Sequence, residues 1–194
     1  MLRRICVFCG SSLGTNDAYR EAARTVGRLF CQREIELVYG GGNVGLLGAL
    51  ADACLQDGGR VIGIIPEALK KKELAHAGLT ELRVVASMHE RKALMADLAD
   101  AFIALPGGYG TWDEFCEVLT WSQLGIQHKA CAVLNINGYY DPLLAMADRA
   151  VSEGFLREVH RALLIADEDP ARLLDRLTVY SVPFTDKWLE RPSR

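Results

Sequence analysis

The sequence predicts one α/β domain built on a single doubly wound, mostly parallel sheet with helices on both faces, a Rossmann-like fold. Three observations predict it. Short apolar runs alternate with segments whose apolar residues recur at helical spacing. Turns rich in glycine or hydroxyl groups follow three of the runs. The 194 residues contain no repeat or linker that would divide the chain. Such alternation implies right-handed crossovers, which place helices on both faces of a parallel sheet.

The expected strands are short, largely apolar runs, and the first of them is near-continuous, the pattern of a strand that is buried on both faces. In chain order they cover residues 3–9, 35–39, 61–65, 82–86, 101–105 and 130–136. The first run ends at a Gly-Ser-Ser turn, the second at three glycines and the third at Pro66. The segment 67–80 is polar and contains three consecutive lysines, so it is expected to be irregular.

Helical spacing of apolar residues follows every expected strand except the third. The expected helices cover residues 19–30, 44–55, 88–98, 112–123 and 142–151, and a helical pattern continues through 171–177. Gly58 and Gly59 end the second helix, because glycine is favoured where a helix stops. One nucleotide-binding domain is therefore expected over residues 1–178, with a polar C-terminal tail over residues 179–194.

The composition excludes several classes of protein. Lysine and arginine total 22 against 25 aspartates and glutamates, so the net charge is −3, and the charges are scattered. Nucleic-acid backbones require a concentrated basic surface, so no nucleic-acid partner is expected. No apolar run approaches the ~20 residues of a membrane span, and the apolar start is too short for a secretory signal. A cytoplasmic protein without membrane attachment is expected.

The six cysteines are expected to pack as small apolar residues. Only Cys6 and Cys9 are close in sequence, and they lie three residues apart on an expected strand. Their sulfurs should therefore face opposite sides of the sheet. No second pair completes a zinc site and the four histidines are scattered, so no metal is expected.

Three glycine- or serine-rich turns form the expected ligand site. Residues 10–12, 40–45 and 106–111 each follow a strand and precede a helix, at the sheet edge where ligands of such folds bind. Bare glycines let backbone N–H groups approach a phosphate, and a helix N-terminus adds partial positive charge. A single loop of this kind is explained equally well as a plain turn. Three loops on one edge favour a bound phosphate.

The middle loop also suggests a different ligand. Gly40, Gly42 and Gly45 satisfy the G-x-G-x-x-G pattern of dinucleotide-binding proteins, with Glu67 as the acidic residue that would bind a ribose. An NAD-binding oxidoreductase therefore stays as an alternative, although the loop follows the second strand and Glu67 comes after Pro66. A P-loop is excluded, because no Gly-Lys-Ser/Thr sequence follows any of the glycine runs.

Charged residues stand near the starts of two expected helices. Thr111 and Glu114 have the spacing of a helix-capping box, so Glu114 is explained equally well as a cap or as a functional carboxylate. Ser87 and Glu90 form another such box. Arg91 and Lys92 follow it in the first turns of a helix, where the helix dipole disfavours cations, so an anionic ligand or a nearby acid is expected there. In a parallel sheet, Arg91 and Glu114 should project over the same edge.

These motifs resemble those of a known family. Residues 106–114 (Pro-Gly-Gly-Tyr-Gly-Thr-Trp-Asp-Glu) and 88–92 (Met-His-Glu-Arg-Lys) are similar to the PGGxGTxxE signature and the arginine–lysine partner of the Lonely Guy (LOG) family. That family comprises cytokinin riboside 5′-monophosphate phosphoribohydrolases, often misnamed lysine decarboxylases. The resemblance extends over most of the chain, up to about residue 178. Trp112 and Asp113 depart from the more usual Leu-Glu.

The resemblance implies hydrolysis of the N-glycosidic bond of a nucleoside 5′-monophosphate, such as AMP or N6-prenyl-AMP, to a free adenine-type base and ribose 5-phosphate. It implies that Arg91 and Glu114 are the catalytic pair and that no cofactor takes part. Together with the loops, it gives these expected substrate-binding residues: Gly10, Ser11, Gly41, Gly42, Glu73, Met88, Arg91, Lys92, Gly107, Gly108, Tyr109, Gly110, Thr111 and Thr120.

The implied reaction suits these residue types. Cleavage of a ribosyl C–N bond builds positive charge on the sugar. A carboxylate such as Glu114 can stabilise that charge and orient or deprotonate the attacking water. Arg91 can hold Glu114 ionised and bind a phosphate or ribose oxygen. Lysine decarboxylation does not suit them, because no lysine has a recognisable context for anchoring pyridoxal phosphate.

Two further expectations concern other classes of function and assembly. A non-catalytic carrier of a nucleotide or of the molybdenum cofactor on the same fold is the alternative to an enzyme. The expected helix over residues 112–123 is apolar on much of its circumference, which indicates burial in its own domain or by a partner. The resembled family is dimeric, with sites near the interface, so a homodimer is expected.

Overall fold

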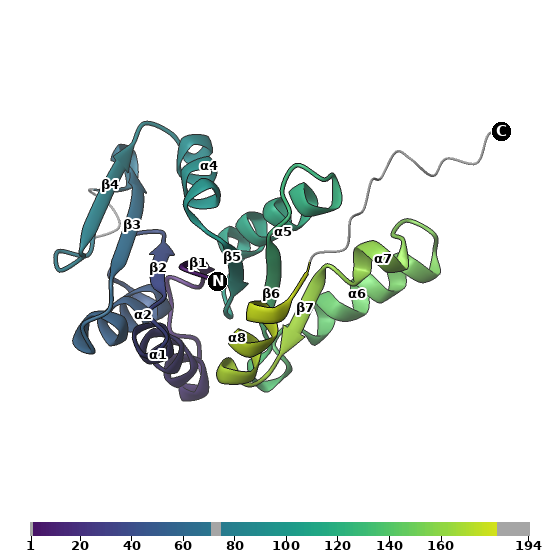
Figure 1. Ribbon diagram of the computed structural model, residues 1–194, viewed down its shortest axis with the longest axis horizontal. Coiled ribbons are helices and arrows are strands. Elements are labelled where there is room, and N and C mark those ends of the chain that lie inside the picture. Colours follow the sequence, from purple (N-terminus) through teal and green to yellow (C-terminus); the bar gives the residue numbers. More distant parts are fainter. Residues whose placement is uncertain (1, 71–74, 182–194) are drawn as a thin grey trace.

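Seven parallel strands form one sheet in the order β4-β3-β2-β1-β5-β6-β7 in the computed structural model, which describes residues 2–70 and 75–181 (Figure 1). The strands are β1 (Arg4–Phe8), β2 (Glu36–Tyr39), β3 (Val61–Pro66), β4 (Glu81–Val85), β5 (Ala101–Ala104), β6 (Ala130–Leu134) and β7 (Leu164–Asp167). The chain winds outward from β1 to β4 and returns to β5 beside β1. The predicted doubly wound α/β fold is confirmed.

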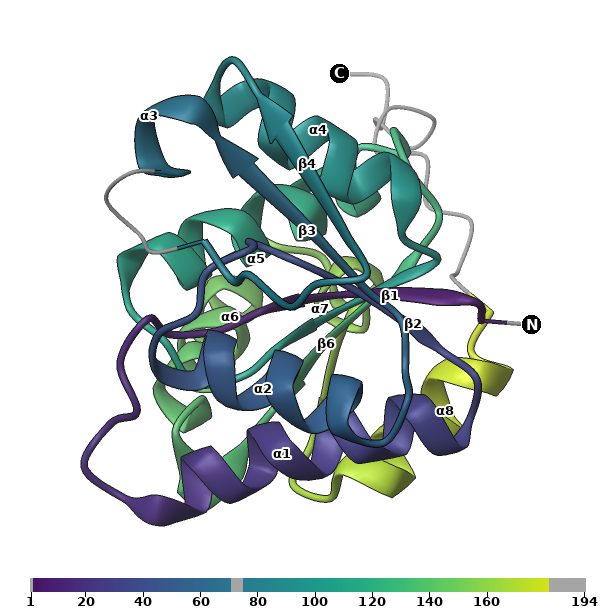
Figure 2. The same ribbon diagram turned by 90° about the vertical axis from the view of Figure 1, so that its left-hand side faces the viewer.

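Helices cover both faces of this sheet. They are α1 (Asp17–Gln32), α2 (Gly45–Gln56), α3 (Glu67–Lys70), α4 (Met88–Leu98), α5 (Tyr109–Gln123), α6 (Asp141–Ser152), α7 (Glu158–Arg161) and α8 (Pro170–Val179). Phe30 of α1 and Leu50 of α2 belong to one apolar core, and Met95 of α4 and Phe115 of α5 belong to the other. Figure 2 shows α1 and α2 on one side of the sheet and α4 on the opposite side.

The two neighbouring cysteines of the first strand region lie on opposite faces, as their spacing predicts. Cys6 packs in the core with α4 and α5, and Cys9 packs in the core with α1 and α2. Burial raises the pKa of both thiols, and the charge of Glu114 raises them further. Both are therefore neutral, unreactive packing groups.

Three elements differ from the sequence prediction. β7 was not predicted, because this four-residue edge strand follows the charged helix α7 and pairs only with β6. The short helix α3 lies inside the segment expected to be irregular. Helix α5 begins at Tyr109, whereas the apolar pattern indicates a start at Trp112. The glycines that precede Trp112 conceal the first turn of this helix, because glycine is unfavourable within helices.

A buried carboxylate fixes the end of β7. Asp167 is 8% exposed and accepts hydrogen bonds from the Arg172 and Arg176 side chains, at 2.6 and 3.0 Å, and from the backbone N–H of Asp169. Burial alone would raise the pKa of Asp167, but these hydrogen bonds lower it well below its usual value. This carboxylate therefore joins the last strand to α8, because both arginines lie on that helix.

The described part of the chain contains no helix that is both long and apolar enough to cross a lipid bilayer. Of the tail expected over residues 179–194, Val179 ends α8 and residues 182–194 lie outside the described residues.

Candidate active site

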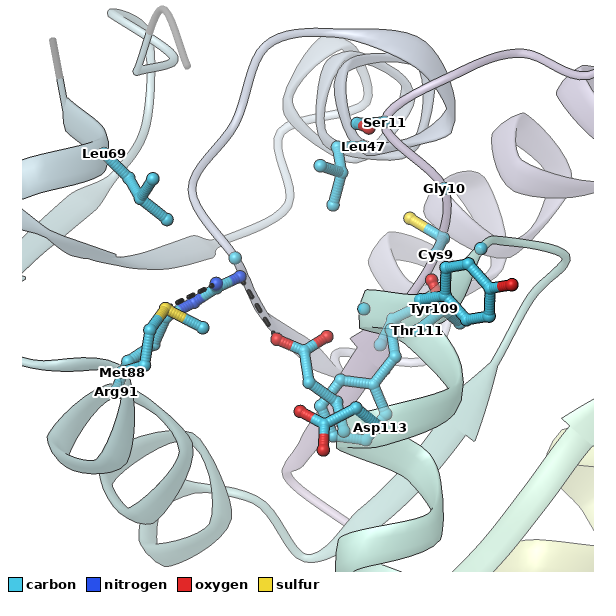
Figure 3. A pocket seen from close by; sticks show the side chains of 16 residues that line it. Cys9, Gly10, Ser11, Leu47, Leu69, Met88, Arg91, Tyr109, Thr111 and Asp113 are labelled. Atoms are coloured by element: carbon cyan, nitrogen blue, oxygen red, sulfur yellow. Dashed lines mark hydrogen bonds and ion pairs between the residues drawn. The ribbon is translucent and has the colours of Figure 1, made fainter. Parts of the chain in front are cut away.

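A cavity of about 330 Å³ opens at the carboxyl edge of the sheet, where the strand order reverses between β1 and β5 (Figure 3). Ligands of doubly wound sheets bind at this point of the fold. Its polar walls come from the turns after β1 and β2, from the start of α4 and from the start of α5. The lining residues expected from the sequence are Gly10, Ser11, Met88, Arg91, Gly108, Tyr109, Gly110, Thr111 and Glu114.

An ion pair crosses this cavity between consecutive helices. The Nη2 atom of Arg91 on α4 lies 3.3 Å from Oε1 of Glu114 on α5, and both side chains are about nine-tenths buried (Figure 3). The Nη1 atom of Arg91 lies 3.7 Å from Sδ of Met88. The prediction that Arg91 and Glu114 project over the same edge is confirmed. The sequence predicts either a ligand or a nearby acid as the partner of Arg91. The structure shows an acid, Glu114 of the same chain.

The turn after β2 makes room for this arginine. A Cβ atom on Gly40 would lie only 2.2 Å from Nη2 of Arg91. Real Cβ atoms do not approach other atoms so closely, so the guanidinium occupies space that exists only because residue 40 is glycine. Gly40 belongs to the G-x-G-x-x-G pattern that predicts a bound dinucleotide, but in the structure it lies against the Arg91 side chain.

The other glycines of that turn are also close to protein atoms. Gly45 has a φ of +60°, and a Cβ atom there would overlap the carbonyl group of Ser11. Gly41 has a φ of +78° and its carbonyl accepts a hydrogen bond from His76, while Gly42 forms an isolated bridge with Ala75. Protein packing thus accounts for Gly40 and Gly45 without a dinucleotide.

The first turn of α5 presents backbone N–H groups at the cavity. Its N-cap is Gly108, and no side chain caps it. The start of a helix carries unsatisfied N–H groups and partial positive charge, a ready site for an anion. Thr111 is the third residue of this helix, and Glu114 lies in its second turn. The capping box proposed for Thr111 and Glu114 is therefore wrong, because the helix starts three residues earlier.

At α4 the expected cap by Ser87 does form, and Glu90 bonds back to the residue before the N-cap. The hydroxyl of Ser87 accepts a hydrogen bond from the N–H of Glu90, at 3.1 Å, and the Glu90 carboxylate accepts one from the N–H of Ala86. These bonds fix the first turn of α4, on which Arg91 lies.

Two tyrosines support the loop between β5 and α5. The hydroxyl of Tyr139 donates to the carbonyl of Gly107, and that of Tyr140 donates to Leu105 at 2.7 Å. Both lie beyond β6, next to the turn over Ile136–Gly138. Nothing in their spacing indicates these contacts, because the two loops meet only once the sheet has formed.

A second cavity of about 320 Å³ adjoins the first. The two share the wall formed by Gly10, Ser11 and Gly108. Gly107 lines this second cavity, and its other walls are mostly apolar, with contributions from Leu13, Tyr19, Leu46, Pro106 and Tyr139. At the rim of the first cavity the ring of Tyr109, 86% exposed, packs edge-on against Trp112.

The remaining expected site residues lie elsewhere. Lys92 forms ion pairs with Asp113 and Glu117 of α5 and does not line either cavity. The hydroxyl of Thr120, further along α5, donates to the carbonyl of Cys116. Glu73 lies outside the described residues. Within the described ranges no group of three or more His, Cys, Asp or Glu residues could hold a metal ion.

The arrangement combines an anion site with a carboxylate. Along α5, Glu114 lies three to five residues beyond the first-turn N–H groups, which is roughly 5–8 Å at the rise of an α-helix. This separation is comparable to the span of one ribose between its 5′-phosphate and its anomeric carbon. The cavity can therefore bind a phosphate at the helix start and place a carboxylate at the far side of the sugar.

Comparison with solved structures identifies proteins of the same fold. The molybdenum cofactor carrier protein of Chlamydomonas reinhardtii matches with a TM-score of 0.68 at 16% identity, over 92% of this chain and 96% of that one. The molybdenum cofactor binding protein of Rippkaea orientalis matches with the same TM-score at 19% identity, over the same shares of the two chains. At such identities the likeness concerns the fold alone.

Sequence comparison identifies much nearer relatives. Rice (Oryza sativa subsp. japonica) probable cytokinin riboside 5′-monophosphate phosphoribohydrolase LOGL9 is 51% identical over 178 residues, which are 92% of this chain and 78% of that protein. The Arabidopsis thaliana enzyme LOG7 is 47% identical over 184 residues, 95% of this chain and 85% of that protein. A family model described as "possible lysine decarboxylase" matches residues 47–177. The chain therefore belongs to the LOG family, the family of these plant phosphoribohydrolases.

Proposed function

We propose that the protein hydrolyses the N-glycosidic bond of an adenine-type nucleoside 5′-monophosphate and releases the free base and ribose 5-phosphate. The observation that carries the proposal is the Arg91–Glu114 ion pair, at 3.3 Å, in the same cavity as the uncapped start of α5. The names of the relatives, cytokinin riboside 5′-monophosphate phosphoribohydrolases, support this class of substrate.

The phosphate binds at the start of α5. The backbone N–H groups of residues 108–111 donate to its oxygens, and the helix dipole favours its negative charge. Gly10 and Ser11 border the same space from the turn after β1. Gly107 is needed behind this loop, because a Cβ atom there would lie 2.1 Å from the hydroxyl of Thr111. Binding therefore relies on the backbone rather than on lysines.

The glycosidic bond lies beside Glu114. As the C1′–N bond breaks, positive charge develops on the ribose, and the Glu114 carboxylate stabilises it. The same carboxylate orients the water whose oxygen bonds to C1′, and one proton of that water finishes on the departing base. Arg91 holds the orientation of Glu114, because the two oppositely charged groups lie 3.3 Å apart and both side chains are about nine-tenths buried.

The substrate contacts from Gly41 and Gly42 are proposed because they lie in a glycine-rich turn at the ligand-binding edge of the sheet. Those from Met88, Lys92, Thr120 and Glu73 are proposed on the resemblance to the family. Of these, Met88 lines the cavity. The adenine ring is accommodated in the same cavity, to which Leu47, Leu69 and Met88 contribute apolar walls.

We propose in addition that the protein is a cytoplasmic homodimer. Exposed apolar side chains on and beside α5 and α6 support an interface, with Trp112 43% and Met146 68% exposed.

Free thiols support a reducing compartment, because all six cysteines are unpaired. Size-exclusion chromatography with light scattering tests the dimer, and a fluorescent fusion tests the compartment.

Base release is the direct test of the activity. The protein is incubated with AMP and with N6-isopentenyl-AMP, and adenine or its prenylated form is quantified by chromatography. Release by the wild type but not by Glu114→Gln supports the proposal. Tight binding of both nucleotides without release of base contradicts it and favours a non-catalytic carrier.

A further inference from the structure

His76 lies in the connection between β3 and β4, and its imidazole is buried, with 8% of the side chain exposed. Nδ1 accepts a hydrogen bond from the backbone N–H of Gly78 at 3.0 Å, and this bond uses only the backbone at residue 78. Nε2 lies 2.9 Å from Oδ1 of Asp52 on α2. Because Nδ1 accepts a bond, the ring proton lies on Nε2, which donates to Asp52. The histidine therefore ties residues 76–78 to helix α2.

The backbone of the same segment is bonded to the glycine turn that follows β2. The N–H of His76 donates to the carbonyl of Gly41 at 3.0 Å, and Ala75 forms a bridge with Gly42. A further bond comes from β2 itself, where the hydroxyl of Tyr39 donates to the carbonyl of Gly42 at 3.1 Å. Consecutive glycines have a wide choice of backbone conformations, so bonds of this kind are needed to keep the turn in one shape.

This turn is the surface against which the guanidinium of Arg91 lies. Gly40 lines the first cavity, and a Cβ atom on it would lie 2.2 Å from Nη2 of Arg91. The same Nη2 atom lies 3.3 Å from Oε1 of Glu114. The Nε atom of Arg91 is buried and has no hydrogen-bond partner within the described ranges, so packing against the turn helps to hold the group. A turn that moves would therefore let the guanidinium move.

The neighbouring contacts of this connection hold a different part of it. Leu79 packs on the apolar core of α1 and α2, and the hydroxyl of Thr80 accepts a hydrogen bond from the N–H of Val61 at 3.1 Å. These contacts fix the chain from residue 79 onward, where it enters β4. Residues 75, 77 and 78 are two alanines and a glycine, so His76 has the only side chain among residues 75–78 that can form hydrogen bonds.

We propose that His76 is a positioning residue, which holds the turn over residues 40–42 in the shape that places the guanidinium of Arg91 beside Glu114. It does so by tying residues 75–78 to Asp52. His76 lines neither of the two cavities, so it acts through the turn. Its effect on turnover rests on the proposed function, whereas its effect on the turn is independent of the reaction.

The kinetic experiment compares the full chain with His76→Ala, His76→Gln and Asp52→Ala, with AMP as substrate. His76→Ala should lower kcat about tenfold and change KM less than about threefold, because the catalytic pair is loosened while the phosphate still binds at the start of α5. His76→Gln should restore most of kcat, because the amide N–H of glutamine can reach Asp52.

Asp52→Ala tests the same tie from its other end. The Asp52 side chain is 53% exposed, so its loss leaves the apolar core intact. This variant should also lower kcat, and the double variant His76→Ala/Asp52→Ala should be no worse than His76→Ala, because both changes break one bond.

His160→Ala is the matched control. His160 is also buried, with 4% exposed, accepts a hydrogen bond from Arg157 at 2.9 Å and lines neither cavity. This variant should keep normal kcat and KM.

Several kinetic outcomes overturn the proposal. Unchanged kcat in His76→Ala or in Asp52→Ala shows that the tie positions nothing. A KM raised about tenfold with kcat retained shows a contact that acts in binding alone. A loss in His76→Gln as large as that in His76→Ala, or an equal loss in His160→Ala, shows that the defect does not come from the bond to Asp52.

Hydrogen exchange separates this proposal from the proposed function, because it needs no substrate. In His76→Ala and Asp52→Ala, peptides that cover residues 40–45 and 75–80 should exchange faster than in the wild type, while peptides from α6 should be unchanged. Exchange at the wild-type rate in residues 40–45 and 75–80 overturns the positioning role. Absence of base release by the wild type contradicts only the proposed function.

Discussion

Arg91 and Glu114 face each other at 3.3 Å across the crevice between consecutive helices, and each side chain is about nine-tenths buried. Removing two charges from water costs free energy, and the attraction between them often does not repay all of it. A buried ion pair is therefore a doubtful source of stability. Its position is more informative, because it lies beside an anion-binding helix start at the reversal point of the sheet. Buried charges placed in a cavity in this way are typical of catalytic sites.

The first prediction concerns the space that Arg91 occupies. Gly40→Ala should displace the guanidinium, because the new Cβ atom would lie 2.2 Å from Nη2. We expect kcat/KM to fall about 100-fold, the effect of misplacing a catalytic group by about 1 Å. Steady-state kinetics with AMP measure the effect, and circular dichroism checks that the fold is kept.

Gly78→Ala is the matched control for Gly40→Ala. Its Cβ atom would come no closer than 3.2 Å to a ring atom of His76, and the residue lies outside the cavity. Equal loss of activity in the two variants would show that the defect of Gly40→Ala is general rather than local to Arg91.

The second prediction concerns the support of the phosphate loop. Tyr139→Phe removes the hydrogen bond to the carbonyl of Gly107, while the ring and its packing stay. A typical hydrogen bond contributes about 1 kcal/mol, so we expect KM for AMP to rise about fivefold with a smaller change in kcat. A normal KM in this variant would show that the loop holds its shape without Tyr139.

The third prediction concerns stability in acid. The pKa of Asp167 is lower in the folded protein than its ordinary value, so the unfolded chain binds this proton more readily. The stabilisation is therefore fully present above about pH 5 and is lost as the pH falls through about 4 and below. Asp167→Asn should lower the free energy of unfolding at pH 7 by about 1–3 kcal/mol.

Urea unfolding at pH 7 and near pH 3 measures this effect. The difference between wild type and Asp167→Asn should shrink at the lower pH, because Asp167 of the unfolded wild-type chain then binds a proton, which stabilises the unfolded state relative to the folded one. A difference that is equally large at both pH values would show that packing, and not the charge of Asp167, stabilises the end of β7.

The sequence predicts the fold and the central pair well, because both depend on strong local patterns. Five of the seven strands are mostly buried apolar runs that their composition reveals, namely β1, β2, β3, β5 and β6. The edge strand β4 is only partly buried and carries Glu81 and Arg83, yet its residues still predict a strand, whereas β7 is a four-residue edge strand beside charged helices. Arg91 and Glu114 could be paired because each lies near the start of a helix that follows a strand of one parallel sheet. The start of α5 could not be placed, since Gly108 and Gly110 hide its first turn.

Contacts between distant loops are the part that the sequence conceals. The roles of Gly40 and Tyr139 depend on which turns meet once the sheet has formed, and no periodicity encodes this. Lys92 shows the same limit in another way. Its place near the start of α4 predicts a nearby anion, but only the structure identifies Asp113 and Glu117 as those anions.

The central claim is that Glu114 acts in cleavage rather than in binding, and one comparison of wild type with Glu114→Gln tests it most directly. Glutamine keeps the size of the side chain but removes the negative charge that would stabilise the ribosyl cation. AMP binding is measured by calorimetry, and adenine release is measured by chromatography on the same samples. We predict that Glu114→Gln binds AMP within about threefold of the wild-type affinity and loses base release by at least about 1,000-fold. Near-normal adenine release by Glu114→Gln would contradict the account.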